Sequence, residues 1–141
     1  MKILVKNKNG ILSFIFGKPK RSVVKRTRLK KSIVTPVERE AARALVHARL
    51  EHFNQHYNFS YNKVAIRNQK TRWGSCSNKG NLNFSVRILM LTPEAQDYLV
   101  VHELCHLKEF NHSQAFWDLV AQQVPEYKRI RQILRYTAPI Q

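Results

Sequence analysis

The chain has 141 residues, of which 25 are lysine or arginine and 9 are aspartate or glutamate, so its formal net charge at pH 7 is +16. This length favours a single domain and excludes the large multidomain enzymes. Leucine, isoleucine, valine and phenylalanine together supply 41 residues, which excludes a disordered chain and is enough for one hydrophobic core. The excess of positive charge bears on binding partners rather than on the fold.

Positive charge is concentrated at the beginning of the chain. Residues 1–35 hold eleven of the 25 basic residues and no acidic residue. Within them, Asn9-Gly10 favours a tight turn, which predicts a β-hairpin between residues 2–6 and 11–16. Neither stretch is typical of a signal peptide or a membrane span, and two cysteines are too few for a disulfide scaffold. We therefore expect a cytoplasmic protein that does not bind membranes.

A basic arm follows the predicted hairpin. Eight of the 14 residues in 18–31 are lysine or arginine. Such a segment binds nucleic acid or an acidic partner, or else it is a solvated stretch of the surface, and no aromatic residue is interleaved with its charges. The candidates for phosphate contacts are Lys25, Arg26, Arg28, Lys30 and Lys31.

The remainder of the chain combines helix and strand patterns. Thr35-Pro36-Val37-Glu38 is a capping box with a proline in the first turn, and apolar residues at helical spacing extend this helix to about residue 57. Two short strands are predicted at residues 64–66 and 82–86, on either side of a loop at 70–79.

The second half of the chain is predicted to be helical. Thr92-Pro93-Glu94 begins a helix that is apolar on nearly every side as far as residue 110 and is therefore buried. Further helices at 113–123 and 125–136 complete an α+β chain.

The predicted buried helix carries the motif His102-Glu103-Leu104-Cys105-His106. Histidines four residues apart project from one face of a helix, so both reach one metal ion. Glu103 lies about 60° around the helix from His106, where it can act on a water molecule without binding the metal. A single buried histidine is more often a hydrogen-bonded core residue, but burying two imidazoles and a carboxylate is costly unless a divalent cation compensates. The motif therefore predicts a metal site with Glu103 as the general base.

A catalytic zinc ion needs a third protein ligand and one open position, and His112 is the nearest candidate. Six more residues of helix would rotate His112 away from the metal, so the helix has to end before it. We expect the helix to end near Phe110, with Asn111 in the left-handed conformation and Ser113 capping the next helix.

Two downstream acids, Glu126 and Asp118, compete with His112 for the role of third ligand. We favour His112, because its short tether costs less loop entropy. The histidine spacing matches that of the metzincins, but Glu109 replaces their glycine and no methionine follows to form a Met-turn. The chain is therefore not an ordinary metzincin.

Four segments of the chain carry a family resemblance: Thr71-Arg72-Trp73-Gly74-Ser75-Cys76-Ser77, Gly80-Asn81-Leu82-Asn83, His102-Glu103-Leu104-Cys105-His106-Leu107, and Asn111-His112-Ser113 with Phe116-Trp117. Over roughly residues 36–135 the chain resembles the YgjP-like zinc metallopeptidases, which are relatives of the SprT-type proteases. The resemblance implies a minimal zincin fold. It also implies zinc held by His102, His106 and His112, with Glu103 as the catalytic acid and base.

These observations predict a short basic hairpin and arm in residues 1–35 and a minimal zincin-like metallopeptidase domain in residues 36–141. The expected domain has a small, mostly antiparallel sheet packed on the buried helix, with flanking helices. In the loop, Trp73 is expected to anchor the core, whereas Arg72 and Ser75 are candidates to donate hydrogen bonds to the oxyanion or the substrate. We expect Cys105, Tyr98 and Phe116 to be core residues.

Two classes of function follow from these features. The first is a zinc metalloendopeptidase that hydrolyses polypeptides with a metal-activated water and Glu103 as the base. The second is a nucleic-acid or acidic-partner binding protein, in which the metal is structural and the arm at 18–31 does the binding. A structural metal site has no need of Glu103, so we favour the peptidase.

Overall fold

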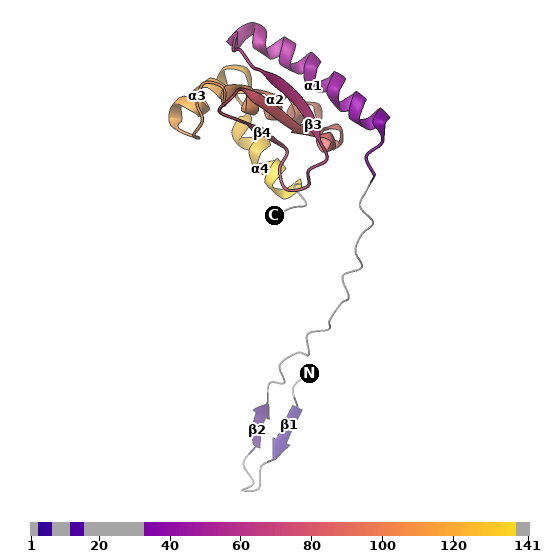
Figure 1. Ribbon diagram of the computed structural model, residues 1–141. Helices are drawn as coiled ribbons and strands as arrows, with labels where there is room; N and C mark the ends of the chain where they lie inside the picture. Colours follow the sequence, from indigo (N-terminus) through magenta and orange to yellow (C-terminus); the bar gives the residue numbers. More distant parts are fainter. Residues whose placement is uncertain (1–2, 7–11, 16–32, 138–141) are drawn as a thin grey trace. The chain divides into compact units, whose positions relative to one another are not determined.

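The computed structural model describes residues 3–6, 12–15 and 33–137 of the chain. The chain divides into two compact units, Met1–Ser32 and Ile33–Gln141. In the first unit, β1 (Ile3–Lys6) pairs with β2 (Leu12–Ile15) in antiparallel register, as the predicted hairpin requires (Figure 1). The predicted turn at Asn9-Gly10 and the basic arm at 18–31 lie outside the described residues.

The second unit is an α+β structure, as predicted. Its elements in chain order are α1 (Pro36–Tyr57), β3 (Lys63–Arg67), β4 (Gly74–Cys76), β5 (Asn81–Ser85), the 3₁₀ helix η1 (Val86–Met90), α2 (Pro93–Cys105), α3 (Gln114–Gln123) and α4 (Tyr127–Thr137). Within the described residues, no helix is both long and apolar enough to cross a membrane.

The sheet of this unit is mixed rather than mostly antiparallel. Its strand order is β3-β5-β4, with β3 parallel to β5 and β4 antiparallel to β5. The difference arises in the predicted loop at 70–79, which contains the three-residue strand β4. Because β4 reverses the chain direction between β3 and β5, those two strands run the same way. Gly80, at φ +72°, lies in the turn between β4 and β5, where glycine meets no steric penalty.

Helix α1 forms as its sequence predicts. The Thr35 hydroxyl accepts a hydrogen bond from the Glu38 backbone N–H at 3.1 Å, and the Glu38 carboxylate accepts one from the Thr35 backbone N–H at 2.8 Å. At the other end, Asn58 takes the left-handed conformation and stops the helix. One side of α1 is buried, through Ala42, Val46, Leu50, Phe53 and Tyr57.

Helix α2 runs through the middle of the unit, where it contacts α1, α3, α4 and β4 (Figure 1). Four of its residues, Val100, Val101, Leu104 and Cys105, are fully buried. The helix therefore presents apolar side chains to neighbours on several sides, as expected.

Two predictions about the end of α2 are wrong. The helix ends at Cys105 rather than near Phe110, with His106 as its C-cap. Asn111 is not left-handed, because Asn58 is the only residue other than glycine with positive φ in the described part of the chain. A tight turn replaces both expected features: the N–H groups of Leu107 and Glu109 donate to the carbonyls of Leu104 and Cys105 at 3.1 and 3.0 Å. This earlier turn reverses the chain, so no left-handed residue is needed at position 111.

Candidate active site

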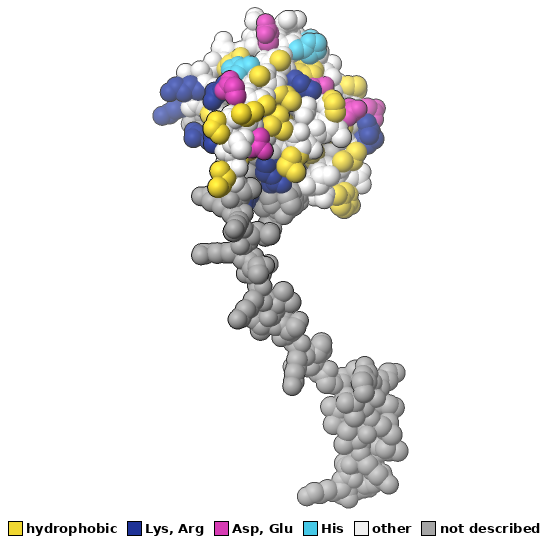
Figure 2. Space-filling view, turned by 90° about the vertical axis from the view of Figure 1, so that its right-hand side faces the viewer, with side chains coloured by type: hydrophobic (Ala, Val, Ile, Leu, Met, Phe, Trp, Pro, Cys, Tyr) yellow, Lys and Arg dark blue, Asp and Glu magenta, His cyan; other side chains and the backbone are white. Residues whose placement is uncertain are grey.

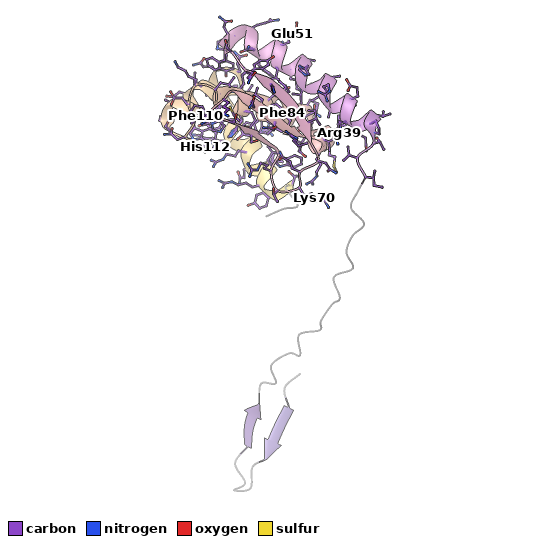
Figure 3. All side chains as sticks on the ribbon, viewed as in Figure 1. Arg39, Glu51, Lys70, Phe84, Phe110 and His112 are labelled. Atoms are coloured by element: carbon purple, nitrogen blue, oxygen red, sulfur yellow. The ribbon has the colours of Figure 1, made fainter. Side chains whose placement is uncertain are left out.

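Three histidine rings converge at the end of α2. Nε2 of His102 lies 3.1 Å from Nε2 of His106 and 3.2 Å from Nε2 of His112. His102 and His106 are half-buried and come from α2, whereas the exposed His112 comes from the segment just before α3, close to Phe110 (Figure 3). The early end of α2 therefore brings His112 back to the histidine pair.

The two acidic alternatives to His112 have other partners. Asp118 accepts a hydrogen bond from Gln114 at 2.8 Å, and Glu126 lies 3.8 Å from Arg129. In the described residues, the one group of three or more close metal-binding side chains consists of His102, His106 and His112.

Neighbouring groups orient each imidazole ring. Nδ1 of His106 donates to the Glu109 carbonyl at 2.9 Å, which leaves Nε2 unprotonated and facing the other two rings. Nδ1 of His102 lies 3.3 Å from the Tyr98 hydroxyl. When Nε2 of His102 binds a metal it is unprotonated, and Nδ1–H then donates to that oxygen.

Aromatic side chains also pack against the histidine rings. Phe116, fully buried, stacks on His106 with a centroid distance of 4.5 Å. Trp117 stacks on His112 at 5.5 Å and on Tyr127 at 4.9 Å. The predictions for Tyr98 and Phe116 as buried residues are confirmed, but sequence reasoning missed their contacts with the histidines. The four-residue spacing from Tyr98 to His102 on one helix face is a signal that could have revealed the first of these contacts.

The histidine cluster suits a divalent cation. Burial, together with the neighbouring His106 and His112, lowers the pKa of His102 to about 3, and burial lowers the pKa of His112 as well. Both rings are therefore neutral at pH 7 and offer nitrogen lone pairs. Two nitrogens bound to one tetrahedral zinc ion at about 2.0–2.1 Å lie roughly 3.3 Å apart. The separations of 3.1 and 3.2 Å from His102 fit that geometry.

Glu103 lies beside the cluster and is only 5% exposed. Burial raises its pKa to about 8, although nearby Arg72 acts in the opposite direction. Its Oε2 atom has no hydrogen-bond partner among the described residues. A Cβ atom added to Gly74 would lie 2.7 Å from Oε1 of Glu103, so only glycine allows β4 to approach the carboxylate this closely. The carboxyl group is therefore held against β4, with one oxygen left for another partner.

A cleft of about 910 Å³ opens over these groups. Its lining includes Arg72, Trp73 and Gly74 from the loop and β4, and also His102, Glu103 and His112. Of the two residues considered for oxyanion binding, Arg72 lines the cleft, whereas the lining within the described region does not include Ser75.

Trp73 is half-buried and packs against the hydrophobic core, as expected for an anchor of the loop. Cys105 is fully buried in the core, and burial raises the pKa of its thiol to about 12. Burial also raises the pKa of Cys76 to about 11, so at neutral pH both cysteines are protonated thiols.

Comparison with solved structures finds metallopeptidases. The metallopeptidase zymogen abylysin of Pyrococcus abyssi is 30% identical with a TM-score of 0.53, over 64% of this chain and 95% of that chain. The metallopeptidase zymogen jannalysin of Methanocaldococcus jannaschii is 23% identical with a TM-score of 0.46, over 66% of this chain and 96% of that one. No curated protein matches the chain.

The comparison with protein families covers more of the chain. The YgjP-like metallopeptidase domain matches residues 12–137, which is a longer match than the resemblance over residues 36–135. The match takes in β2 and every helix and strand of the second unit, including the histidine cluster, Glu103 and the cleft. The chain therefore belongs to the YgjP-like family of metallopeptidases.

Proposed function

We propose that the protein is a zinc-dependent endopeptidase in which His102, His106 and His112 hold the metal and Glu103 is the general base. The observation that carries this proposal is the convergence of three imidazole nitrogens beside one buried carboxylate in the wall of an open cleft. A structural metal site is closed on all sides, whereas a catalytic one keeps a position open. His102 and His112 line an open cleft, so a metal ion bound there would keep such a position. The site thus favours a catalytic metal over the alternative of a structural metal in a nucleic-acid-binding protein.

Zinc suits this set of ligands, because imidazole nitrogen is among its preferred donors and three protein ligands leave the fourth position free. Once bound, zinc supplies a Lewis acid that polarises the scissile carbonyl and lowers the pKa of water. The Glu109 carbonyl and the Tyr98 hydroxyl fix the orientation of two of the rings, and such outer contacts raise the basicity of the ligands.

Glu103 is suited to moving the proton. As a carboxylate, it takes a proton from the water that attacks the scissile carbonyl, and it then gives that proton to the leaving nitrogen. Burial raises the pKa of Glu103 above that of an ordinary glutamate, which makes its carboxylate a stronger base. Its Oε2 atom has no partner in the described part of the chain and is available for this exchange.

The peptide itself would lie along β4. In the described sheet, β4 pairs with β5 alone, so its other edge can accept an extended peptide as an added strand. Gly74 on this strand lies against Glu103, which places the added peptide next to the base. Arg72, which lines the cleft beside Glu103, is our candidate donor to the oxyanion.

We further propose that residues 36–141 carry this activity and that residues 1–35 form a separate basic segment. The division of the chain between Ser32 and Ile33 supports this boundary. Family membership supports polypeptides as the substrates. Nucleic-acid binding through the arm stays a prediction.

The substitution Glu103→Gln tests the proposed base. An amide cannot accept the proton of water, so hydrolysis of casein should fall by about two to four orders of magnitude, while the protein keeps about one zinc per chain. The matched control is Glu51→Gln, which makes the same change at an exposed position on α1 (Figure 3) and should leave hydrolysis unchanged. Unaltered cleavage by the Glu103 variant would refute the assignment.

A further inference from the structure

The walls of the cleft are positively charged. Five of the lining residues are cationic: Lys70, Arg72, Arg87, Arg131 and Arg135. The single acidic residue in the described lining is Glu103, which is buried. By contrast, the face of the second unit drawn in Figure 2 mixes basic, acidic and apolar side chains. The face drawn there thus does not share the single sign of charge found in the cleft lining.

Aromatic rings hold two of these cations in place. The guanidinium group of Arg87 lies 5.1 Å from the centre of the Trp73 ring and donates to the Lys70 carbonyl at 3.4 Å. The guanidinium group of Arg131 lies 4.8 Å from the centre of the Trp117 ring, and that ring stacks on His112. Arg131 is therefore fixed close to the proposed metal site.

None of the five cleft cations forms an ion pair among the described residues, although Arg72 lies near enough to Glu103 to act on its pKa. The ion pairs in the described part of the chain join Arg43 to Glu40, Arg49 to Asp97, and Arg129 to Glu126, all outside the cleft lining. Four of the five cleft cations are exposed and Arg87 is half-buried. Like charges gathered in one cleft repel one another, and an anionic ligand relieves that repulsion.

We propose that this cleft selects polypeptide segments that carry aspartate or glutamate side chains next to the scissile bond. The proposal rests on the proposed peptidase function and adds its substrate class. The cations come both from the segment at 70–72 with Arg87 and from α4, so acidic side chains near the bond would meet positive charge from two parts of the fold. A nucleic acid would also be attracted, but the cations share the cleft lining with His102, Glu103 and His112, the groups that we propose act on the peptide bond.

Two amidated, internally quenched peptides test this substrate class. They are identical except that glutamates flanking the scissile bond in one are glutamines in the other, and amidation removes the terminal carboxylate as a source of charge. The acidic peptide should have a kcat/KM about ten-fold higher at low salt, and the ratio should fall as salt is added. Binding of both peptides to the Glu103→Gln variant, followed by fluorescence anisotropy, should show the same preference without turnover.

Variants on α4 locate the preference in the cleft. The double substitution Arg131→Gln with Arg135→Gln should reduce the ratio several-fold. The control is Lys128→Gln with Arg129→Gln, which removes the same charge from the same helix outside the cleft lining and should keep the ratio. Zinc content and melting temperature check that both double variants fold. If the Arg131→Gln with Arg135→Gln variant does not fold, Arg135→Gln alone takes its place.

The outcomes separate the two proposals. If neither peptide nor casein is cleaved by the zinc-loaded protein, the proposed function is wrong, whereas the anisotropy measurement still tests the charge preference. If the acidic and amide peptides are bound and cleaved equally, the substrate class is wrong and the peptidase stands. A preference that survives in the Arg131 and Arg135 variant also overturns the assignment of selectivity to this cleft.

Discussion

At the scale of single residues, the site depends on neighbouring groups that contact the histidines and Glu103 and fix their orientation. The Glu109 carbonyl binds His106, the Tyr98 hydroxyl lies against His102, and Trp117 stacks on His112. These contacts fix the rings before a metal arrives, so less conformational entropy is lost on binding. His112 is the least buried of the three and is attached to a turn instead of a helix.

The substitution His112→Ala tests the third ligand. Loss of an outer contact to a metal ligand costs about 10–100-fold in affinity, so loss of the ligand itself should weaken zinc binding by at least about 100-fold. Competition with a chelator of known affinity measures this change. His47→Ala, at an exposed position on α1, is the control and should bind zinc as the wild type does. Equal zinc affinity in the two variants would show that His112 is not a ligand.

Gly74→Ala tests the close approach of β4 to Glu103. The added Cβ would lie 2.7 Å from Oε1 and 2.8 Å from Cγ of Glu103, so the carboxyl group has to move. A displacement of about 1 Å at a catalytic group can reduce the rate about 100-fold, and we expect a fall in kcat of that size with zinc content unchanged. Gly80→Ala is the control: its positive φ makes the change cost about 1 kcal/mol of stability, but its Cβ does not meet Glu103. Equal kcat values for the two variants would contradict the positioning role of Gly74.

At the scale of elements, α1 depends on a reciprocal cap. The cap joins the Thr35 and Glu38 side chains to each other's backbone N–H groups. The Thr35 backbone N–H and hydroxyl both donate to the Glu38 carboxylate, and these two hydrogen bonds lower the pKa of Glu38 below its ordinary value of 4.5. A carboxylate with a lowered folded pKa stabilises the fold above its ordinary pKa, and this contribution is lost as the pH falls through the folded value. The helix should therefore be more weakly capped in acid.

Thr35→Ala should lower the free energy of unfolding by about 1 kcal/mol at pH 7, because it removes the acceptor at the N-cap. The difference from the wild type should shrink as the pH falls from 4.5 through the lower folded pKa of Glu38, because protonation weakens the hydrogen bond that the carboxylate accepts from the Thr35 hydroxyl. Urea denaturation of the metal-free proteins measures both values. Ser60→Ala, at an exposed loop position, controls for the loss of a hydroxyl group. A pH-independent difference would show that the hydrogen bond from the Thr35 hydroxyl to the Glu38 carboxylate does not stabilise the fold.

Local signals predicted the helices well, because a cap and its apolar spacing are both written within a few residues. Features that depend on distant contacts were harder to predict. Strand β4 has three residues and no alternating pattern, and the parallel pairing of β3 with β5 depends on where that strand lies. The end of α2 was misplaced because the turn at 104–109 competes with helical continuation, and a sequence does not show which one packs better.

The same distinction applies to the candidate site. The spacing of His102, Glu103 and His106 places them on one helix, so their proximity could be predicted from the sequence. The contact of Gly74 with Glu103 joins a strand to a helix, and the stacking of Trp117 on His112 depends on how α3 packs. Such contacts require the fold itself.

At the scale of the whole molecule, the second unit places the proposed catalytic groups where its elements meet. The site combines the end of α2, the edge strand β4, the turn before α3 and one side of α4. Neighbouring elements bury Glu103 almost completely while the cleft stays open to a substrate. This arrangement explains how a domain of this size accommodates a buried carboxyl group and an accessible histidine cluster together.

Titration of the metal-free protein with zinc tests the central claim most directly. Removal of the metal with a chelator should abolish casein hydrolysis, and stepwise addition of zinc should restore it in proportion to occupancy, reaching a maximum at about one zinc per chain. His47→Ala should follow the same curve, because His47 lies on the exposed side of α1. Hydrolysis by the fully metal-free protein, or a protein that binds one zinc and cleaves no polypeptide, would contradict a three-histidine zinc peptidase.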